Sequence, residues 1–195
     1  MDDILIEIEK YAEEKNVPIM NKEGIAFLCE LIKKYNVKSI LEIGSAIGYS
    51  SIKMALLDKD IKVTTIERDE ERYNEAVKNI NNCNLNDQIN IILGDALETE
   101  ITGSYDMIFI DAAKSQNIKF FNKYKVLLNK NGIIVTDNMS FHGLVEEKER
   151  IRNKNLRQLV NKIKKYIVFL KENEEFNTVF YKEGDGVAVS EKVEG

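Results

Sequence analysis

The sequence contains few of the residues that mark linkers, disulfide frameworks or metal clusters. Its 195 residues include one proline, one histidine, two cysteines and no tryptophan. Cys29 and Cys83 stand far apart in segments with a helical pattern, which predicts two free thiols and excludes a disulfide framework or a zinc site. With a single proline, no repeat and no low-complexity tract, residues 1–195 are expected to form one domain.

Long apolar runs and a basic leader are also missing. No stretch approaches the roughly 18 consecutive apolar residues of a membrane span. The Met1-Asp-Asp start lacks the basic segment of a signal peptide. Contents of 44% hydrophobic and 31% charged residues are those of an ordinary globular protein. We therefore expect a cytoplasmic protein that binds no membrane.

The net charge of −5 is unevenly distributed along the chain. Nine Lys or Arg residues and one acid, Glu149, lie between Lys148 and Lys171, so this segment carries +8 and the rest of the chain −13. Such an asymmetry indicates a surface that faces a polyanion. The alternative interpretation is an ordinary solvated face of a helix.

The apolar pattern predicts two N-terminal helices within residues 1–36, followed by an α/β core over 37–195. Pro18 separates the two helices, because proline disfavours helical geometry in the residue before it. Five strand-like runs then alternate with helix-like runs, which is typical of parallel sheets covered on both faces. Two more strands flank the turn sequence Glu183-Gly-Asp-Gly186 and indicate a C-terminal antiparallel hairpin. Strands are expected at 38–43, 61–66, 88–93, 105–110, 132–136, 177–182 and 187–190, and helices at 2–15, 22–35, 48–58, 69–83, 115–128 and 146–172.

Polar side chains follow two strand-like runs of the predicted sheet. Asp111 ends the first run, with Lys114 three residues further on, and Asp137 and Asn138 end the second. Ligands of open parallel sheets bind outside the carboxyl ends of the strands. Two carboxylates and one amide oxygen at this edge form a set of hard donors that suits Mg²⁺ and not Zn²⁺. Lys114 is a candidate base beside them.

Three other strand ends carry the residue types of a nucleoside-binding cleft. The first strand leads into Glu42-Ile-Gly44-Ser-Ala-Ile-Gly48, which is neither a dinucleotide fingerprint nor a P-loop. The carboxylate of Glu42 favours a cationic or amine-bearing ligand there. The second strand ends at Glu67, where an acid binds a ribose diol in nucleotide-binding sheets of this type. The third ends at Gly94-Asp-Ala96, whose small residues are able to flank an adenine ring.

These motifs resemble those of class I S-adenosylmethionine-dependent methyltransferases. The resemblance implies a Rossmann-like fold with a mostly parallel seven-stranded sheet and helices on both faces. The segments Phe109-Ile-Asp-Ala-Ala-Lys114 and Thr136-Asp-Asn138 are similar to the metal-dependent O-methyltransferases, a family that includes catechol and caffeoyl-CoA O-methyltransferases. The likeness covers essentially the whole chain, and it implies that residues 1–195 are one O-methyltransferase domain.

The resemblance implies a role for each candidate residue. Asp111, Asp137 and Asn138 would bind Mg²⁺ or another divalent ion such as Mn²⁺. This ion would lower the pKa of the attacking hydroxyl group, and Lys114 would take its proton. Asp111 would be shared between the metal and the cofactor. The residues implied to contact S-adenosylmethionine are Met20, Glu42, Gly44, Ser50, Glu67, Asp95, Ala96 and Asp111.

The predicted metal site suits any substrate with two adjacent oxygens, such as a catechol or 5-hydroxyuracil. Asn16-Val-Pro-Ile-Met20 and Glu183-Gly-Asp-Gly-Val-Ala-Val-Ser190 resemble a bacterial branch that methylates 5-hydroxyuridine at the tRNA wobble position to 5-methoxyuridine. The basic segment supports tRNA, because a row of cations supplies phosphate contacts that do not depend on nucleotide sequence. The residues predicted to contact RNA are Arg150, Arg152, Lys154 and Arg157.

Two alternatives to a tRNA methyltransferase stay open. One is a methyltransferase for a small phenol, of the catechol or hydroxycinnamoyl type. The other is a nucleoside-binding module without catalysis, against which the intact set of Asp111, Lys114, Asp137 and Asn138 argues. A homodimer is typical of the family that the sequence resembles, and we expect one here.

Overall fold

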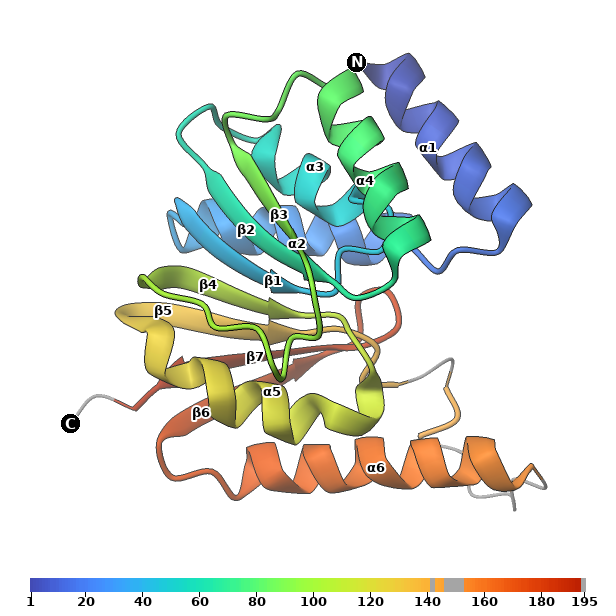
Figure 1. Cartoon of the computed structure of the whole chain (residues 1–195). Helices are drawn as coiled ribbons and strands as arrows, with labels where there is room; N and C mark the ends of the chain where they lie inside the picture. The colour runs from blue at the N-terminus through green and yellow to red at the C-terminus, as the bar shows by residue number, and fades with distance from the viewer. Residues whose placement is uncertain (141–142, 146–152, 194–195) are drawn as a thin grey trace.

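The computed structural model describes residues 1–140, 143–145 and 153–193. Seven strands form one sheet in the order β3-β2-β1-β4-β5-β7-β6 (Figure 1). The first five strands of that order are parallel, whereas β7 runs antiparallel to both β5 and β6. The predicted mostly parallel sheet with a terminal hairpin is therefore confirmed. The strands are β1 (Ser39–Ile43), β2 (Lys62–Glu67), β3 (Ile89–Leu93), β4 (Tyr105–Ile110), β5 (Leu128–Thr136), β6 (Phe176–Tyr181) and β7 (Val187–Lys192).

Helices cover both faces of the sheet, as Figure 1 shows. One face packs against α1 (Asp2–Lys15), α2 (Lys22–Lys34), α3 (Tyr49–Ala55) and α4 (Glu70–Asn82). The other packs against α5 (Asn117–Tyr124) and α6 (Lys154–Lys171). Short 3-10 turns, η1 (Lys114–Gln116) and η2 (Lys125–Leu127), flank α5. Within the described part of the chain, no helix is long and apolar enough to cross a membrane.

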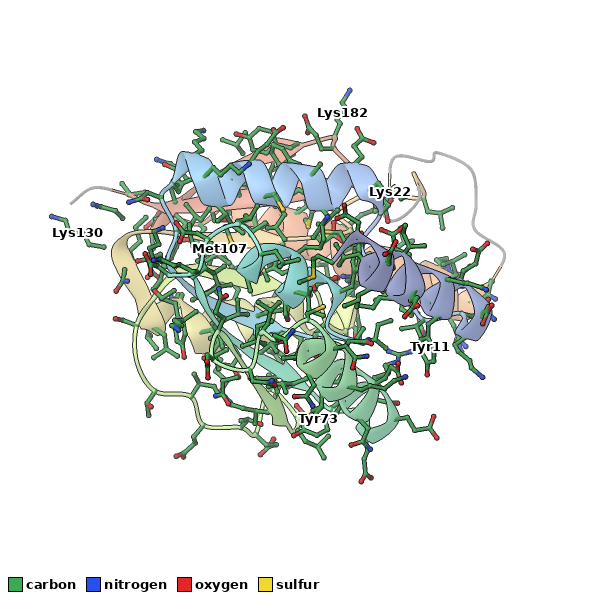
Figure 2. All side chains as sticks on the ribbon, turned by 90° about the horizontal axis from the view of Figure 1, so that it is seen from above. Tyr11, Lys22, Tyr73, Met107, Lys130 and Lys182 are labelled. Atoms are coloured by element: carbon green, nitrogen blue, oxygen red, sulfur yellow. The ribbon has the colours of Figure 1, made fainter. Side chains whose placement is uncertain are left out.

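The core has two layers because side chains of each central strand alternate between the faces. In β4, Met107 and Phe109 join the cluster under α1 to α4, whereas Ile108 and Ile110 join the cluster under α5 and α6. All four side chains are fully buried. Figure 2 shows Met107 inside the molecule and Lys130 pointing outward from its edge. A continuous apolar run is what a parallel strand buried on both faces requires.

The two N-terminal helices hold a short loop over the carboxyl ends of the strands. Helix α1 ends at Lys15 and is followed by its C-cap, Asn16, which adopts a left-handed conformation with φ 52°. The side chain of Asn21 caps α2 by accepting a hydrogen bond of 2.8 Å from the backbone N–H of Gly24. The hydroxyl of Tyr49 donates a 2.7 Å bond to Glu9 and thereby ties α1 to α3. Residues 17–21 are thus fixed at both ends.

Strand β5 begins four residues earlier than the pattern predicts. The segment 129–132 (Asn-Lys-Asn-Gly) has the composition of a turn, but the structure includes it in the strand. An irregularity in the β4–β5 pairing accommodates the segment, since Tyr105 pairs with Leu128 and Met107 with Ile133. The helix predicted over 115–128 is also divided, into η1, α5 and η2.

Candidate active site

A cavity of about 430 Å³ opens at the carboxyl ends of the parallel strands. Its wall combines the loops after β1, β2, β3, β4 and β5 with the α1–α2 loop and the β6–β7 turn. Of the eleven residues predicted for cofactor, metal and catalysis, ten line this cavity, and Glu42 is the exception. The ten are Met20, Gly44, Ser50, Glu67, Asp95, Ala96, Asp111, Lys114, Asp137 and Asn138.

Gly44 allows two strand ends to come close together. Its φ is 95°, in the left-handed region, and a Cβ atom there would lie 2.7 Å from the carbonyl oxygen of Asp111. Both the conformation and the contact exclude any larger residue without rearrangement. Gly48, with φ 82°, then begins α3. The glycines therefore place the loop after β1 against the start of the loop after β4.

The carboxylate of Glu67 is fixed by backbone groups. One oxygen accepts a 2.8 Å hydrogen bond from the N–H of Ala46, and the other accepts bonds of 2.9 Å from Arg68 and Asp69. These three donors restrict the orientation of the carboxylate before any ligand binds. The strand-end acid predicted to bind a ribose is thus held rigidly in the cavity wall.

Glu42 differs from the expectation that it contacts S-adenosylmethionine. Its side chain is wholly buried behind the glycine loop. The hydroxyls of Ser50, Ser51 and Thr65 all donate hydrogen bonds to its carboxylate, the last at 2.6 Å. Burial raises the pKa of Glu42 to about 7 despite these bonds, which act to lower it. The side chain of Glu42 therefore connects β1 to β2 and α3 inside the protein through hydrogen bonds.

The loop after β3 presents its two predicted residues differently. Asp95 is exposed at the rim, and one of its carboxylate oxygens accepts a 2.8 Å bond from the N–H of Leu97. Ala96 is buried at 8% exposure and lines the cavity. An acidic rim beside a small apolar surface is a suitable environment for a flat, polar-edged ring.

Opposite charges meet at the other end of the cavity. Lys114 Nζ lies 2.6 Å from Asp111 Oδ1, with both side chains largely shielded from solvent. Asn138 has a left-handed φ of 61°, and its amide nitrogen donates a 2.9 Å bond to Asp137. The amide oxygen of Asn138 is then the atom available to a cation. Two carboxylates, one amide and one amine thus converge as predicted.

The negative charge of Asp137 is poorly compensated by its surroundings. It is 3% exposed, and burial raises the pKa of its carboxyl group well above the usual range. The negative charge of Asp111 raises the pKa further, whereas Lys114 opposes the shift. No cluster of three His, Cys, Asp or Glu side chains able to hold a metal occurs in the described part of the chain. Asp111, Asp137 and the amide oxygen of Asn138 are the candidate oxygen donors for a cation at this end.

Sequence reasoning missed the contribution of the β6–β7 turn. Asp185 lines the cavity, and its charge also raises the pKa of Asp137. Two backbone bonds of 2.9 Å hold the turn, from Met139 N–H to the Gly186 carbonyl and from Ser140 N–H to the Asp185 carbonyl. The available signal was an acid between two glycines, which the sequence indicated only as a hairpin turn.

The predicted RNA-contacting residues are only partly described. Lys154 and Arg157 lie in the first turn of α6, whereas Arg150 and Arg152 lie outside the described residues. Helix α6 packs against η1, the segment that begins with Lys114. Its outward side chains include Lys162, Lys164 and Lys165, all exposed. The basic helix is therefore adjacent to the segment that carries the candidate base.

The sheet order and the cavity at its carboxyl edge define a Rossmann-like S-adenosylmethionine methyltransferase fold. Residues 2–193 match the O-methyltransferase family, and the chain belongs to this family.

Individual relatives show how close the likeness is. The fold matches, at 41% identity and a TM-score of 0.92, a Staphylococcus aureus protein provisionally assigned as a caffeoyl-CoA O-methyltransferase, covering 97% of this chain and 92% of that one. An O-methyltransferase from Bacillus cereus in complex with SAH (S-adenosylhomocysteine) is 26% identical, with a TM-score of 0.83 and coverage of 99% and 92%.

Curated relatives are matched over shorter segments. A catechol O-methyltransferase from Niastella koreensis is 34% identical over 154 residues, which are 74% of this chain and 69% of the relative. Tapetum-specific methyltransferase 1 from Arabidopsis thaliana is 32% identical over 149 residues, or 73% of this chain. The chain spans 63% and 64% of two Arabidopsis thaliana relatives, less than two thirds of their length.

Proposed function

We propose that this chain transfers a methyl group from S-adenosylmethionine to a substrate oxygen with the help of a divalent cation. The observation that carries the proposal is the convergence of ten predicted residues on one cavity. Family membership supports the reaction class, and the SAH complex of the Bacillus cereus relative supports the cofactor. When bound, S-adenosylmethionine supplies an electrophilic methyl group and leaves as SAH.

One end of the cavity, the charged end, is formed by Asp111, Lys114, Asp137 and Asn138, and these residues fit a hard divalent cation. Asp111 and Asp137 bring two negative charges into a largely buried place, which is unfavourable unless a cation compensates them. Lys114 supplies only one positive charge and contacts Asp111. Asp111, Asp137 and Asn138 would hold Mg²⁺ or Mn²⁺ through oxygen atoms. When bound, such an ion makes a substrate hydroxyl group more acidic.

Lys114 is the residue we assign to remove the substrate proton. Its Nζ lies 2.6 Å from Asp111 Oδ1, and the residue lines the cavity. In its neutral form this amine could accept the proton of a substrate hydroxyl held beside Asp111. Glu67 would hold the ribose, and Ala96 would lie against the adenine.

The test is methyl transfer from labelled S-adenosylmethionine to a catechol and to bulk tRNA, each with and without a chelator. We expect transfer to at least one substrate, loss of transfer with the chelator, and recovery on addition of Mg²⁺. Asp137→Ala should lose at least about a hundredfold in turnover, since truncating a ligand impairs both metal affinity and orientation. Chelator-insensitive transfer by the wild type and by Asp137→Ala would refute the metal role.

We further propose 5-hydroxyuridine of tRNA as the substrate. Its 5-oxygen lies beside the C4 carbonyl, so the base offers a cation the same pair of oxygens as a catechol. The exposed lysines of α6, which packs against η1, support the tRNA assignment because they could contact phosphates beside the cavity. The sequence motifs that resemble the tRNA-modifying branch support it independently.

Charge reversal on α6 is an experiment that distinguishes tRNA from a small molecule as the substrate. Lys164→Glu with Lys165→Glu should weaken tRNA binding and reduce its salt slope by about one for each lost phosphate contact. Methylation of a catechol should stay unchanged, because both side chains are exposed. The matched control reverses the charges of Lys33 and Lys59, which are exposed and lie outside α6. Equal effects of both double variants on tRNA would contradict recognition by α6.

A small phenol is the second candidate substrate. It is favoured by the names of the relatives, which include catechol and caffeoyl-CoA O-methyltransferases. Rapid turnover of a catechol, together with no change in 5-methoxyuridine in cells that lack the protein, would decide for it. The homodimer stays a proposal as well. Ile6 of α1 is 61% exposed and is a candidate contact, which sedimentation of the Ile6→Glu variant would test.

A further inference from the structure

Lys123, in the last turn of α5, binds three carbonyl groups of a single short loop. Its ammonium group donates hydrogen bonds to the carbonyls of Ala96 at 2.9 Å, Leu97 at 2.7 Å and Thr99 at 2.8 Å. An ammonium group has three N–H bonds, and each one here has an acceptor. The hydroxyl of Tyr124 donates a further 2.5 Å bond to the Ala96 carbonyl.

The loop cannot satisfy these carbonyls by itself. The carbonyl of Asp95 accepts the N–H groups of Glu98 at 3.0 Å and Thr99 at 2.8 Å, and its carboxylate accepts the N–H of Leu97. These bonds wind the loop into a compact turn and use its N–H donors. The following carbonyls then resemble the end of a helix, where a lysine is a suitable partner. Lys123 supplies that partner from another element.

The opposite surface of the same loop faces the cavity. Gly94, Asp95 and Ala96 line the cavity, and so does Phe120, which lies one turn before Lys123 on α5. Helix α5 therefore contributes to the cavity wall through Phe120 and fixes the loop from behind through Lys123. A change in the position of Lys123 would alter the shape of the wall at the place assigned to adenine.

We propose that Lys123 is a positioning residue that sets the preference of the site for adenine. This inference rests on the proposed function, in which the loop 94–99 contacts the adenine of S-adenosylmethionine. Adenine presents an amino group beside a ring acceptor, whereas hypoxanthine presents a carbonyl beside an N–H. A rigid backbone can match only one of these patterns, and a loop freed from Lys123 can adapt to both.

The test compares the dissociation constants of SAH and S-inosylhomocysteine by calorimetry. The wild type should prefer SAH. Lys123→Met should bind SAH about tenfold more weakly, because three carbonyls lose a charged donor. Its preference for SAH over S-inosylhomocysteine should fall towards unity, and Lys123→Arg should restore part of it. Lys119 is an exposed residue on the same helix, and the control variant Lys119→Met should match the wild type in both dissociation constants.

Each other outcome is decisive. If Lys123→Met weakens the binding of both ligands by the same factor, or of neither, Lys123 is merely structural and the inference fails. SAH binding by the wild type would still support the proposed function. If the wild type binds no SAH, the proposed function fails and this inference with it. Should Lys123→Met not fold, Tyr124→Phe removes one bond to the Ala96 carbonyl. It must then lower the preference measurably, or the proposal is refuted.

Discussion

The two ends of the cavity compensate negative charge in different ways. At the end proposed to bind the nucleoside, the nucleoside end lined by Glu67, Asp95 and Ala96, the carboxylate of Glu67 accepts three backbone N–H bonds that belong to the fold. At the other end, the carboxyl group of the buried Asp137 has a raised pKa, although the side-chain amide and the backbone N–H of Asn138 both donate hydrogen bonds to it. Folding alone therefore completes the first end. The second end would reach a comparable balance with the added cation proposed above, and we therefore expect metal dependence there.

The largest effect should follow from removing the amine at the charged end. Lys114→Met keeps the length of the side chain but cannot accept a proton. Turnover should fall by roughly 10²- to 10⁴-fold, the usual range for a general base. Affinity for SAH, measured by calorimetry, should stay within about twofold of the wild type, because the cofactor contacts assigned to Glu67 are unchanged. Normal turnover by this variant would remove Lys114 from the mechanism.

A smaller effect should follow from neutralising the nucleoside end. Glu67→Gln retains the shape of the side chain but loses the charge that strengthens a bond to a ribose hydroxyl. We expect SAH affinity to fall roughly ten- to hundredfold. Turnover at saturating cofactor should change little, which distinguishes this variant from Lys114→Met. Unchanged affinity would mean that the ribose lies elsewhere.

The last effect is on stability rather than on turnover or cofactor affinity, and it concerns Glu42, which is buried behind the glycine loop. Burial raises its pKa from an ordinary value of 4.5 to about 7, so the native state binds a proton more tightly than the unfolded chain. Its contribution to the free energy of unfolding should therefore decline as pH rises from 4.5 to 7, by roughly 3 kcal/mol at most. Above pH 7 the contribution should be constant.

Glu42→Gln isolates this contribution. Urea denaturation of the wild type and the variant between pH 5 and 8 gives the difference in their free energies of unfolding, which cancels the titration of the other groups. The variant should gain stability relative to the wild type as pH rises through this range. A difference that is independent of pH would show that Glu42 titrates normally.

The sequence was sufficient to predict the order of elements, and ten of the eleven site residues predicted from it line the cavity, because strand ends in a parallel sheet meet at one edge. It was insufficient for Glu42. Nothing local to that residue indicates that Ser50, Ser51 and Thr65 direct their hydroxyls at its carboxylate. Those contacts depend on how α3 and β2 pack around β1.

Asp185 was missed for a related reason. A hairpin turn is recognisable from its glycines, but its neighbours depend on which strand the hairpin joins. Strand β7 pairs with β5, so the turn comes to lie beside the loop that carries Asp137 and Asn138. Sheet order is set by the packing of both core layers and has no local signature in the sequence.

The position of β7 also bears on how the protein is made. It is the last strand of the sheet along the chain, yet it pairs between β5 and β6. While the ribosome is still synthesising residues 176–192, β5 has an unpaired edge and the turn 183–186 is absent from the cavity wall. The cavity is therefore completed last, and until then the edge of β5 is a surface on which nascent chains could associate wrongly.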